Sequence, residues 1–472
     1  MIAVHGRHCG TIQTIVSLRK ELTLLERITA KAISFIERYM PAPYLFALLL
    51  TFLAAALALL IPRTAPAQIV HHWYGGLWEI LPFTAQMMLV LVCGHALVDA
   101  PLVKRGLDWF SRLPKTERQA GILVFLAGWA TALFNWGFCL VAVGILVREI
   151  GRRLPGVSRG YLAAAGYSGF VVWASGLSSS IALVSASPGN PLNIVERMAH
   201  QVIPLRETLG ASFNLFPVAG VLILMPLLFW HMSPNRARVG SEVSATPEPP
   251  KNPVSTTAQS APPATLTPAQ KIEQSPWITA LLVMMALGYL LARFQSGSFN
   301  LDINMMIFLL LLLGWILHGT PIRYMQAFHE GGRTAGPLLL AYPLYGGILG
   351  LIRDTGLADW FALLFVSFST AYTLPFWSYI SSNVITLFVP SGGGHWAVQG
   401  PVMVQAAMEL HASLPKTAMA VAFGEQTANM VQPFWALPIA SIAGLNIREM
   451  MGYCLLTLAV AFPLFGLALL LF

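Results

Sequence analysis

Residues 389–395 read Val-Pro-Ser-Gly-Gly-Gly-His, and they interrupt a stretch, 360–408, that contains no Asp, Glu, Lys or Arg. A proline followed by three glycines breaks a helix. Within a bilayer, the backbone groups that such a break frees are tolerated only where they are buried in protein or line a wet cavity. Because the limbs beside the break are too short to span, the sequence predicts a re-entrant hairpin that enters and leaves on one face.

A second stretch, 119–147, has the same character. It also lacks Asp, Glu, Lys and Arg, and Phe134-Asn135-Trp136-Gly137 interrupts its centre. If this stretch is a hairpin and the N-terminus is cytoplasmic, 22 of the 28 Lys and Arg residues fall on the cytoplasmic side. A full crossing would instead turn the four arginines that follow it outward. The positive-inside rule therefore favours a second re-entrant hairpin.

The composition of the 472 residues indicates that lipid is the main solvent. Hydrophobic residues make up 56% of the chain, charged residues only 10%, and the mean hydropathy is +0.66. Since soluble proteins carry about 25% charged residues, a soluble protein is excluded. The net charge of +8 indicates cytoplasmic loops and no nucleic-acid partner. The four cysteines lack metal-ligand spacing, so we expect neither a disulfide nor a metal centre.

Nine further apolar segments are predicted to cross the membrane. They are 44–61, 80–98, 161–191, 212–231, 277–294, 303–318, 335–352, 417–441 and 448–472. The predicted fold class is therefore an all-α polytopic membrane protein with about nine full spans, two re-entrant hairpins and two broken helices.

The two apolar halves show the same order of elements on either side of a segment rich in Pro, Ser, Thr and Ala. The span 277–294 has no counterpart, so it starts the second half from the opposite face. This arrangement predicts an inverted-topology repeat, the usual build of secondary transporters. We expect a cytoplasmic amphipathic segment (1–43), a first repeat (44–231), a cytoplasmic disordered linker (232–276), a connecting span (277–302) and a second, inverted repeat (303–472).

Two polar breaks follow the hairpins. Residues 185–191 read Ser-Ala-Ser-Pro-Gly-Asn-Pro, and residues 424–433 read Gly-Glu-Gln-Thr-Ala-Asn-Met-Val-Gln-Pro. Half-helix N-termini present N–H groups to an anion, and unwound carbonyls and hydroxyls can hold a cation. We therefore predict a site for a small carboxylate, with Na+ or H+ as coupling ion and no other cofactor. The serines at 178–180 are expected to bond back within their helix.

The residues predicted to bind substrate or ion lie at the hairpin tips and in these breaks. They are Asn135, Gly137, Ser185, Ser187, Gly189, Asn190, Ser391, Gly392, Gly393, Gly394, His395, Glu425, Gln426, Asn429 and Gln432.

Glu425 and His395 each have two interpretations. Glu425 is the one acid of 20 that we place in mid-span, and an intramembrane carboxylate is expensive enough to indicate function. Alternatively, it is protonated or hydrogen-bonded and only fixes the helix break. His395 follows the glycines at a hairpin tip, where it could donate to a carboxylate or cap a helix.

Enzyme motifs are missing from the sequence. It contains no Walker A sequence, no H-E-x-x-H and no G-x-S-x-G. A membrane hydrolase that uses His395 and Glu425 has no nucleophile and base spacing to support it. A passive channel can be built on paired re-entrant loops, although inverted halves with broken helices favour a carrier.

These motifs resemble the short-chain fatty acid transporter family over residues 28–472. The resemblance lies in Asn135-Trp136-Gly137-Phe138, in 187–191, in 390–396 and in the run from Gly424 to Pro438. Ser187 stands where Thr is expected, and it keeps the hydroxyl group.

The resemblance implies membership of the wider ion-transporter superfamily, in which paired hairpins and broken helices move in an elevator-type motion. It also implies uptake of short-chain fatty acids, such as acetoacetate or butyrate, across a bacterial inner membrane. A carrier for another small organic anion, such as a dicarboxylate, and assembly as a homodimer are left open.

Overall fold

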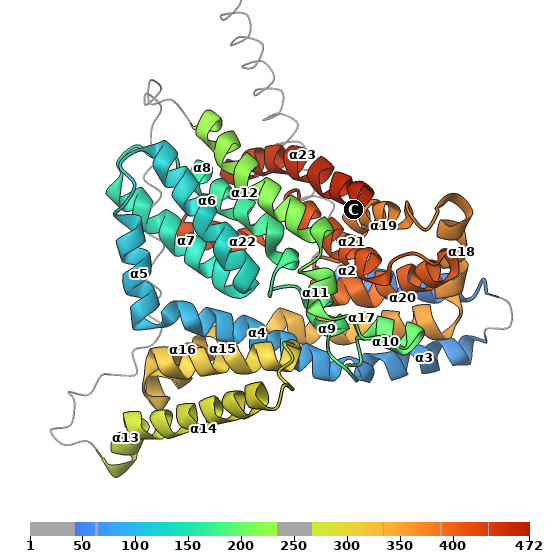
Figure 1. The fold of residues 1–472 in the computed structure, drawn as a ribbon, viewed down its shortest axis with the longest axis horizontal. Coiled ribbons are helices and arrows are strands. Elements are labelled where there is room, and N and C mark those ends of the chain that lie inside the picture. The colour runs from blue at the N-terminus through green and yellow to red at the C-terminus, as the bar shows by residue number, and fades with distance from the viewer. Residues whose placement is uncertain (1–42, 62–64, 234–266, 334, 388, 433) are drawn as a thin grey trace, which may run out of the picture.

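The computed structural model describes residues 43–61, 65–233, 267–333, 335–387, 389–432 and 434–472. The predicted N-terminal amphipathic segment and most of the predicted linker lie outside these residues. The described residues form helices and no strand, which confirms the predicted all-α class. In Figure 1, α13 and α14 lie at one edge beside α15 and α16, and α18 to α20 lie at the opposite side.

The first half consists of thirteen labelled elements or fewer in each described segment, in chain order. They are α2 (Pro43–Ala58), α3 (Pro66–Glu79), α4 (Leu81–Asp99), α5 (Pro101–Ser111), α6 (Glu117–Phe134), α7 (Trp136–Arg153), α8 (Arg159–Gly169), the 3-10 helix η1 (Phe170–Ser175), α9 (Ser180–Ser185), α10 (Ile194–Ala199), α11 (Leu205–Thr208) and α12 (Ser212–Met232).

The second half follows the same order after α13 and α14. Its elements are α13 (Pro268–Glu273), α14 (Pro276–Gln295), α15 (Ile303–His318), α16 (Pro321–Gly332), α17 (Gly336–Asp354), α18 (Leu357–Phe368), α19 (Leu374–Thr386), α20 (Gly392–Leu410), α21 (Leu414–Ala428), α22 (Ala436–Ala443) and α23 (Arg448–Leu471).

Five helical segments of the described residues are long and apolar enough to cross a membrane, judged by length and composition. They are Pro66–Asp99, Arg159–Ser185, Ser212–Met232, Pro276–Gln295 and Arg448–Leu471. The apolar helices at the predicted spans 44–61 and 303–318 are shorter. The predicted spans 335–352 and 417–441 correspond to α17 and to the broken pair α21 and α22. The number of nine full spans therefore stays a prediction.

The second hairpin is shorter than predicted. Its limbs are α19 and α20, and the beginning of the predicted hairpin 360–408 belongs to the separate helix α18. The turn before α19 contains no glycine or proline. Thr370 and Thr373 stabilise it, because each hydroxyl accepts a hydrogen bond from the other's backbone N–H, at 3.2 and 2.9 Å. Such side-chain turns leave no helix-breaking residue in the sequence.

The predicted span 161–191 breaks earlier than its Pro-Gly-Asn sequence. The helix α8 tightens into η1, and the chain turns at 176–179 before α9 begins. The expectation for the serines at 178–180 is therefore wrong for two of them. Ser179 caps α9 by accepting an amide hydrogen bond of 3.2 Å, and Ser178 donates to a carbonyl of α6 at 2.5 Å.

The helix α3 is an element that the sequence reading left unassigned. It packs against α17, and the two helices cross at Gly76 and Gly346. A Cβ on Gly76 would come within 2.3 Å of the Gly346 carbonyl oxygen, so only glycine allows this approach. The available signal was Pro66 followed by Ile69 and Trp73 at helical spacing.

The two halves pack on each other in a reciprocal way. The helix α3 contacts α17 while α16 contacts α4, and α2 contacts α17 while α15 contacts α4. Within the halves, α4 contacts α7 as α17 contacts α20, and α6 contacts α8 as α19 contacts α21. A two-fold relation between the halves produces such pairing. The pattern supports a repeat, while its inversion across a membrane stays a prediction.

Charged side chains tie three elements together at their ends. Glu79 of α3 accepts hydrogen bonds from Arg197 of α10 and, at 2.7 Å, from Arg353 of α17. Arg353 also bonds to its neighbour Asp354 through two nitrogens, at 2.6 and 2.7 Å. The segment after the first break is therefore held to α3 and α17.

The crossing of α3 and α17 can be tested with two adjacent glycines. Gly76→Ala places a methyl group against a backbone oxygen, and we expect a loss of about 1–3 kcal/mol in unfolding free energy. Gly75→Ala meets nothing within 4 Å among the described residues, and we expect a gain of about 0.5–1 kcal/mol. Thermal unfolding in detergent measures both, and equal midpoints would contradict the crossing.

Candidate functional site

The tip of the first hairpin is closed by its own asparagine. Asn135 separates α6 from α7, and its Oδ1 caps α7 by accepting a hydrogen bond of 2.8 Å from the Phe138 amide. Its Nδ2 donates to the Val90 carbonyl of α4 at 3.2 Å. Gly137 also lies against α4, because a Cβ there would be 3.2 Å from the Leu91 side chain. The polar atoms of Asn135 therefore hold this tip to α4.

The tip of the second hairpin is open. Ser391 precedes α20, but its Oγ donates to the Tyr342 hydroxyl of α17 at 2.8 Å and caps none of the described amides of α20. The first N–H groups of a helix have no acceptor within that helix. The N-terminus of α20 therefore keeps its donors and its partial positive charge for another group.

Three glycines let α20 begin in close contact with its neighbours. A Cβ on the first, second and third glycine of 392–394 would come within 2.3, 2.1 and 2.4 Å of Ser180, Phe83 and Tyr345, respectively. These neighbours belong to α9, α4 and α17. The glycines thus bring the backbone of the second tip against both the first broken helix and the two helices that meet between the halves.

His395 lies in a hydrogen-bond network inside the second hairpin. Its Nε2 is 2.5 Å from Gln399 Oε1 and 3.2 Å from Ser382 Oγ, and its Nδ1 is 3.1 Å from Thr386 Oγ1. The ring is fully buried. Because all three partners come from α19 and α20, these contacts favour the structural interpretation of His395.

The two broken helices are joined by amide side chains. Gln426 of α21 accepts a hydrogen bond from the Ala174 amide and donates to Ser175 Oγ, both at 3.0 Å. Asn429, at the second break, accepts a hydrogen bond of 3.0 Å from Trp173 Nε1. The second break is therefore held against η1 of the first half.

Four of the predicted binding residues have buried polar atoms without a hydrogen-bond partner in the described part of the chain. They are Ser185 Oγ, both carboxylate oxygens of Glu425, Asn429 Nδ2 and Gln432 Oε1. Buried polar atoms in folded proteins are normally paired, so unpaired ones call for a ligand, an ion or a proton.

Glu425 lies close to the open tip. It is fully buried, and its Oε2 lies 3.4 Å from the position that a Cβ would take on Gly392. Burial of an ionised carboxylate is costly unless it is paired and hydrogen-bonded. This arrangement therefore suits a protonated carboxyl group, placed next to the N-terminus of α20.

A small cavity lies where both tips and both breaks meet. It has about 330 Å³ of empty space including its mouth, near the lower end of the range of about 300–1,000 Å³ for small-molecule sites. The lining residues are Met87, Trp136, Phe170, Trp173, Tyr342, Ser391, Gly392 and Trp435. Most of the wall is aromatic, and the start of α20 supplies its polar end.

Trp435 links the cavity wall to the open tip. Its indole N–H donates to the Pro390 carbonyl at 3.1 Å, and its ring meets Trp136 edge-on with 5.0 Å between the ring centroids. The tips of both hairpins therefore contact one side chain that follows the second break.

The residues at the Pro-Gly-Asn sequence do not line this cavity in the described structure. Ser187 Oγ accepts a hydrogen bond of 3.1 Å from the Ile303 amide at the start of α15. Gly189 turns the chain with a φ of 68°, and Asn190 donates to Gln86 of α4 at 3.0 Å. These contacts fasten the segment after α9 to α4 and α15.

Sequence analysis missed most of the cavity wall. Trp173 and Tyr342 lie in apolar segments, where an aromatic residue of the wall looks like any packing residue. Trp435 was within the run that carries the family resemblance, and that run was the available signal. Only the polar end, at Ser391 and Gly392, was predicted directly from helix-breaking residues.

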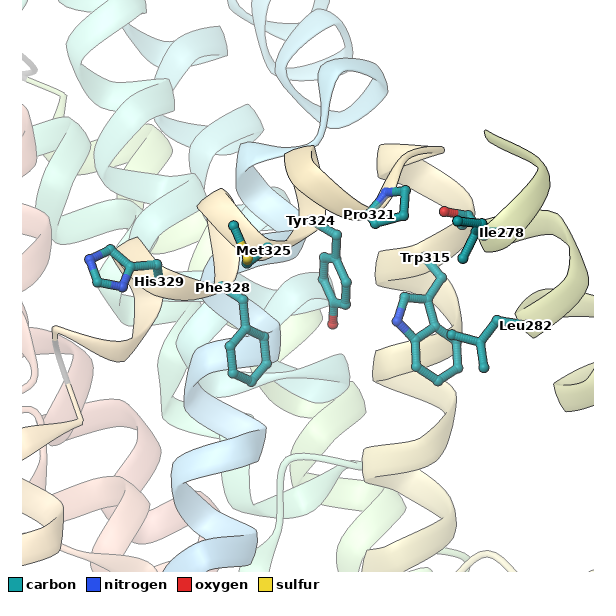
Figure 2. A pocket seen from close by; sticks show the side chains of 9 residues that line it. Ile278, Leu282, Trp315, Pro321, Tyr324, Met325, Phe328 and His329 are labelled. Carbon is teal, nitrogen blue, oxygen red and sulfur yellow. The ribbon is translucent and has the colours of Figure 1, made fainter. Parts of the chain in front are cut away.

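A larger groove lies away from the tips, between α14 and the pair α15 and α16 (Figure 2). Figure 2 shows Trp315 of α15 and Tyr324 of α16 beside Leu282 of α14. The groove has about 840 Å³ of empty space, much of it open, and its lining is largely apolar. Because α14 is only 11% buried, we expect lipid to fill this groove. The candidate site is the cavity at the tips.

The fold is similar to two solved transporters. MtrF of Neisseria gonorrhoeae, described as one of a class of antimetabolite efflux pumps, matches with a TM-score of 0.55 and 15% sequence identity over 93% of this chain and 97% of its own. The YdaH transporter of Alcanivorax borkumensis matches with a TM-score of 0.53 and 15% identity over 90% of this chain and 98% of its own. At this identity the likeness concerns the fold.

The sequence comparisons identify the family. A protein of Escherichia coli (strain K12), provisionally named a short-chain fatty acid transporter, is 36% identical over 95% of this chain and 100% of its own length. A protein of Haemophilus influenzae with the same provisional name is 34% identical over 94% of this chain and 98% of its own. The family model described as short chain fatty acid transporter matches residues 24–472. The chain belongs to the short-chain fatty acid transporter family.

Proposed function

We propose that this membrane protein takes up short-chain monocarboxylates, such as acetoacetate or butyrate, by cation-coupled alternating access. The observation that supports the proposal is the cavity between the hairpin tips and the breaks. Its aromatic wall matches a short apolar tail, and the uncapped N-terminus of α20 matches a carboxylate. The provisional names of two relatives support the same substrate class.

Alternating access requires two bodies that move relative to each other. We assign the stationary body to α2, α3, α4, α15, α16 and α17, because these helices pair reciprocally across the halves. The hairpins and broken helices form the moving body. The cytoplasmic N-terminus, the bacterial inner membrane, the inversion of the repeat and a homodimer stay predictions from the sequence.

A carrier and a channel differ in counterflow. We expect that vesicles preloaded with unlabelled acetoacetate accumulate labelled acetoacetate transiently, because a carrier exchanges substrate across the membrane. Purified protein in vesicles, with protein-free vesicles as control, measures this. An open pore gives no stimulation by substrate on the far side, and that result would replace the carrier with a passive anion channel.

Substrate class can be tested by competition in the same assay. Monocarboxylates from acetate to hexanoate should compete with labelled acetoacetate, and the longest acids should compete least because the cavity is small. Succinate should compete poorly, because the described cavity has one polar end. Stronger competition by succinate than by butyrate would instead identify a dicarboxylate carrier.

The position of the cavity can be tested at Gly392. Gly392→Ala would place a methyl group 2.3 Å from Ser180 Oγ and narrow the cavity, so uptake should fall at least about tenfold, equivalent to 1.4 kcal/mol. Adding Ser180→Ala removes the closest contact and should restore part of the uptake. Gly288→Ala, where nothing lies within 4 Å among the described residues, is the control. Normal uptake by folded Gly392→Ala would contradict this site.

A further inference from the structure

The start of α20 and the carboxyl group of Glu425 lie together with their bonding capacity unused. Ser391 turns its hydroxyl to Tyr342 and does not cap α20 in the described structure. Glu425 is fully buried beside Gly392, and neither of its oxygens has a partner among the described residues. Free donors and a potential acceptor therefore share one enclosed place.

We infer that Glu425 and the substrate carboxylate compete for the N–H groups at the start of α20, and that the competition couples substrate to a proton. When Glu425 is protonated, those N–H groups are available to the substrate. When Glu425 loses its proton, its carboxylate takes the N–H groups and excludes the substrate. The inference rests on the proposed function, because it describes how that transport is coupled.

The comparison of the two hairpin tips supports this assignment. Asn135 occupies the place in the first hairpin that Ser391 occupies in the second, between the two limbs. Asn135 satisfies its helix by capping α7, at 2.8 Å from the Phe138 amide. The second tip keeps its helix end open, and a carboxyl group is the polar side chain beside it.

The polarity of the helix end favours a proton over a sodium ion. The N-terminus of a helix carries about half a positive charge, which attracts an anion and repels a cation. A bare sodium ion at Glu425 would lie next to this charge. A proton only neutralises the carboxylate, and it leaves the helix end to the substrate anion.

Other titratable groups near Glu425 are engaged or distant. Tyr342 and Tyr345 of α17 interact electrostatically with Glu425, and Tyr342 is bonded to Ser391. The elements packed against α21 contribute Tyr379 (α19), His395 and Glu409 (α20), Arg206 and Glu207 (α11), and Arg448, Glu449, Tyr453 and Cys454 (α23), while η1 and α9 contribute none.

Among these groups, His395 is the nearest in sequence to the start of α20. Its ring nitrogens face Ser382, Thr386 and Gln399 within the hairpin. It is therefore placed to hold the two limbs together, and Glu425 is placed to take the proton.

The test compares three forms of the protein in vesicles. Glu425→Gln fixes a neutral side chain beside α20, and Glu409→Gln makes the same change on an exposed residue bonded to Gln405. An inward pH gradient should accelerate acetoacetate uptake in the wild type and in Glu409→Gln. Glu425→Gln should keep counterflow and show a gradient-to-no-gradient rate ratio of about one, because a fixed neutral group carries no proton.

Binding gives a second readout on the same variants. Butyrate is ionised well above pH of about 4, so changes in its affinity between neutral and alkaline pH come from the protein. Wild-type affinity should fall towards a limit of about tenfold per pH unit as Glu425 ionises. The affinity of Glu425→Gln should not change with pH. All initial rates are corrected with protein-free vesicles, since neutral acids cross lipid unaided.

Three results would overturn the inference. The first is pH-gradient stimulation that persists in Glu425→Gln. The second is loss of both butyrate binding and counterflow in folded Glu425→Gln. The third needs no variant: wild-type uptake that responds to a sodium gradient or to membrane potential, because exchange of one proton with one carboxylate moves no net charge. Absence of counterflow in the wild type would instead remove the proposed function itself.

Discussion

A helix that breaks inside a bilayer must find partners for the backbone groups that it frees, and this constraint governs the whole structure. The first hairpin meets it with Asn135, which caps α7 and bonds to α4. The second hairpin does not meet it with its own side chains, because Ser391 bonds to Tyr342. Its helix end is instead enclosed by η1, α9, α17 and α21, and this enclosure is what makes a site for an anion.

The surrounding packing keeps that helix end in place. Glycines at the start of α20 bring it against Phe83, Tyr345 and Ser180, and Gln426 fastens α21 to η1. Reciprocal contacts between the halves position α4 and α17 on either side of the tips. The charge distribution agrees with this design, since Glu79, Arg197 and Arg353 pair at helix ends while Glu425 is buried without a charged partner in the described structure.

The sequence was informative where a residue type forces the backbone. Pro390 and the glycines after it predicted the second break, and Asn135 marked the first. The turn at Thr370 and the early end of α8 were missed, because hydroxyl groups satisfy these turns without glycine or proline. The aromatic wall was also missed, since Trp173 in an apolar segment reads as a packing residue. Burial shows which polar groups lack partners, and one sequence alone cannot show that.

The central claim is that the carboxylate of the substrate binds at the start of α20, within the aromatic cavity. A structure with bound 4-bromobutyrate tests it most directly, because anomalous scattering locates the bromine atom without ambiguity. The account predicts a bromine peak among Trp136, Trp173 and Trp435, with the carboxylate at the amides of Gly392 and its neighbours. A peak confined to the groove between α14 and α16, with the cavity empty, would contradict it.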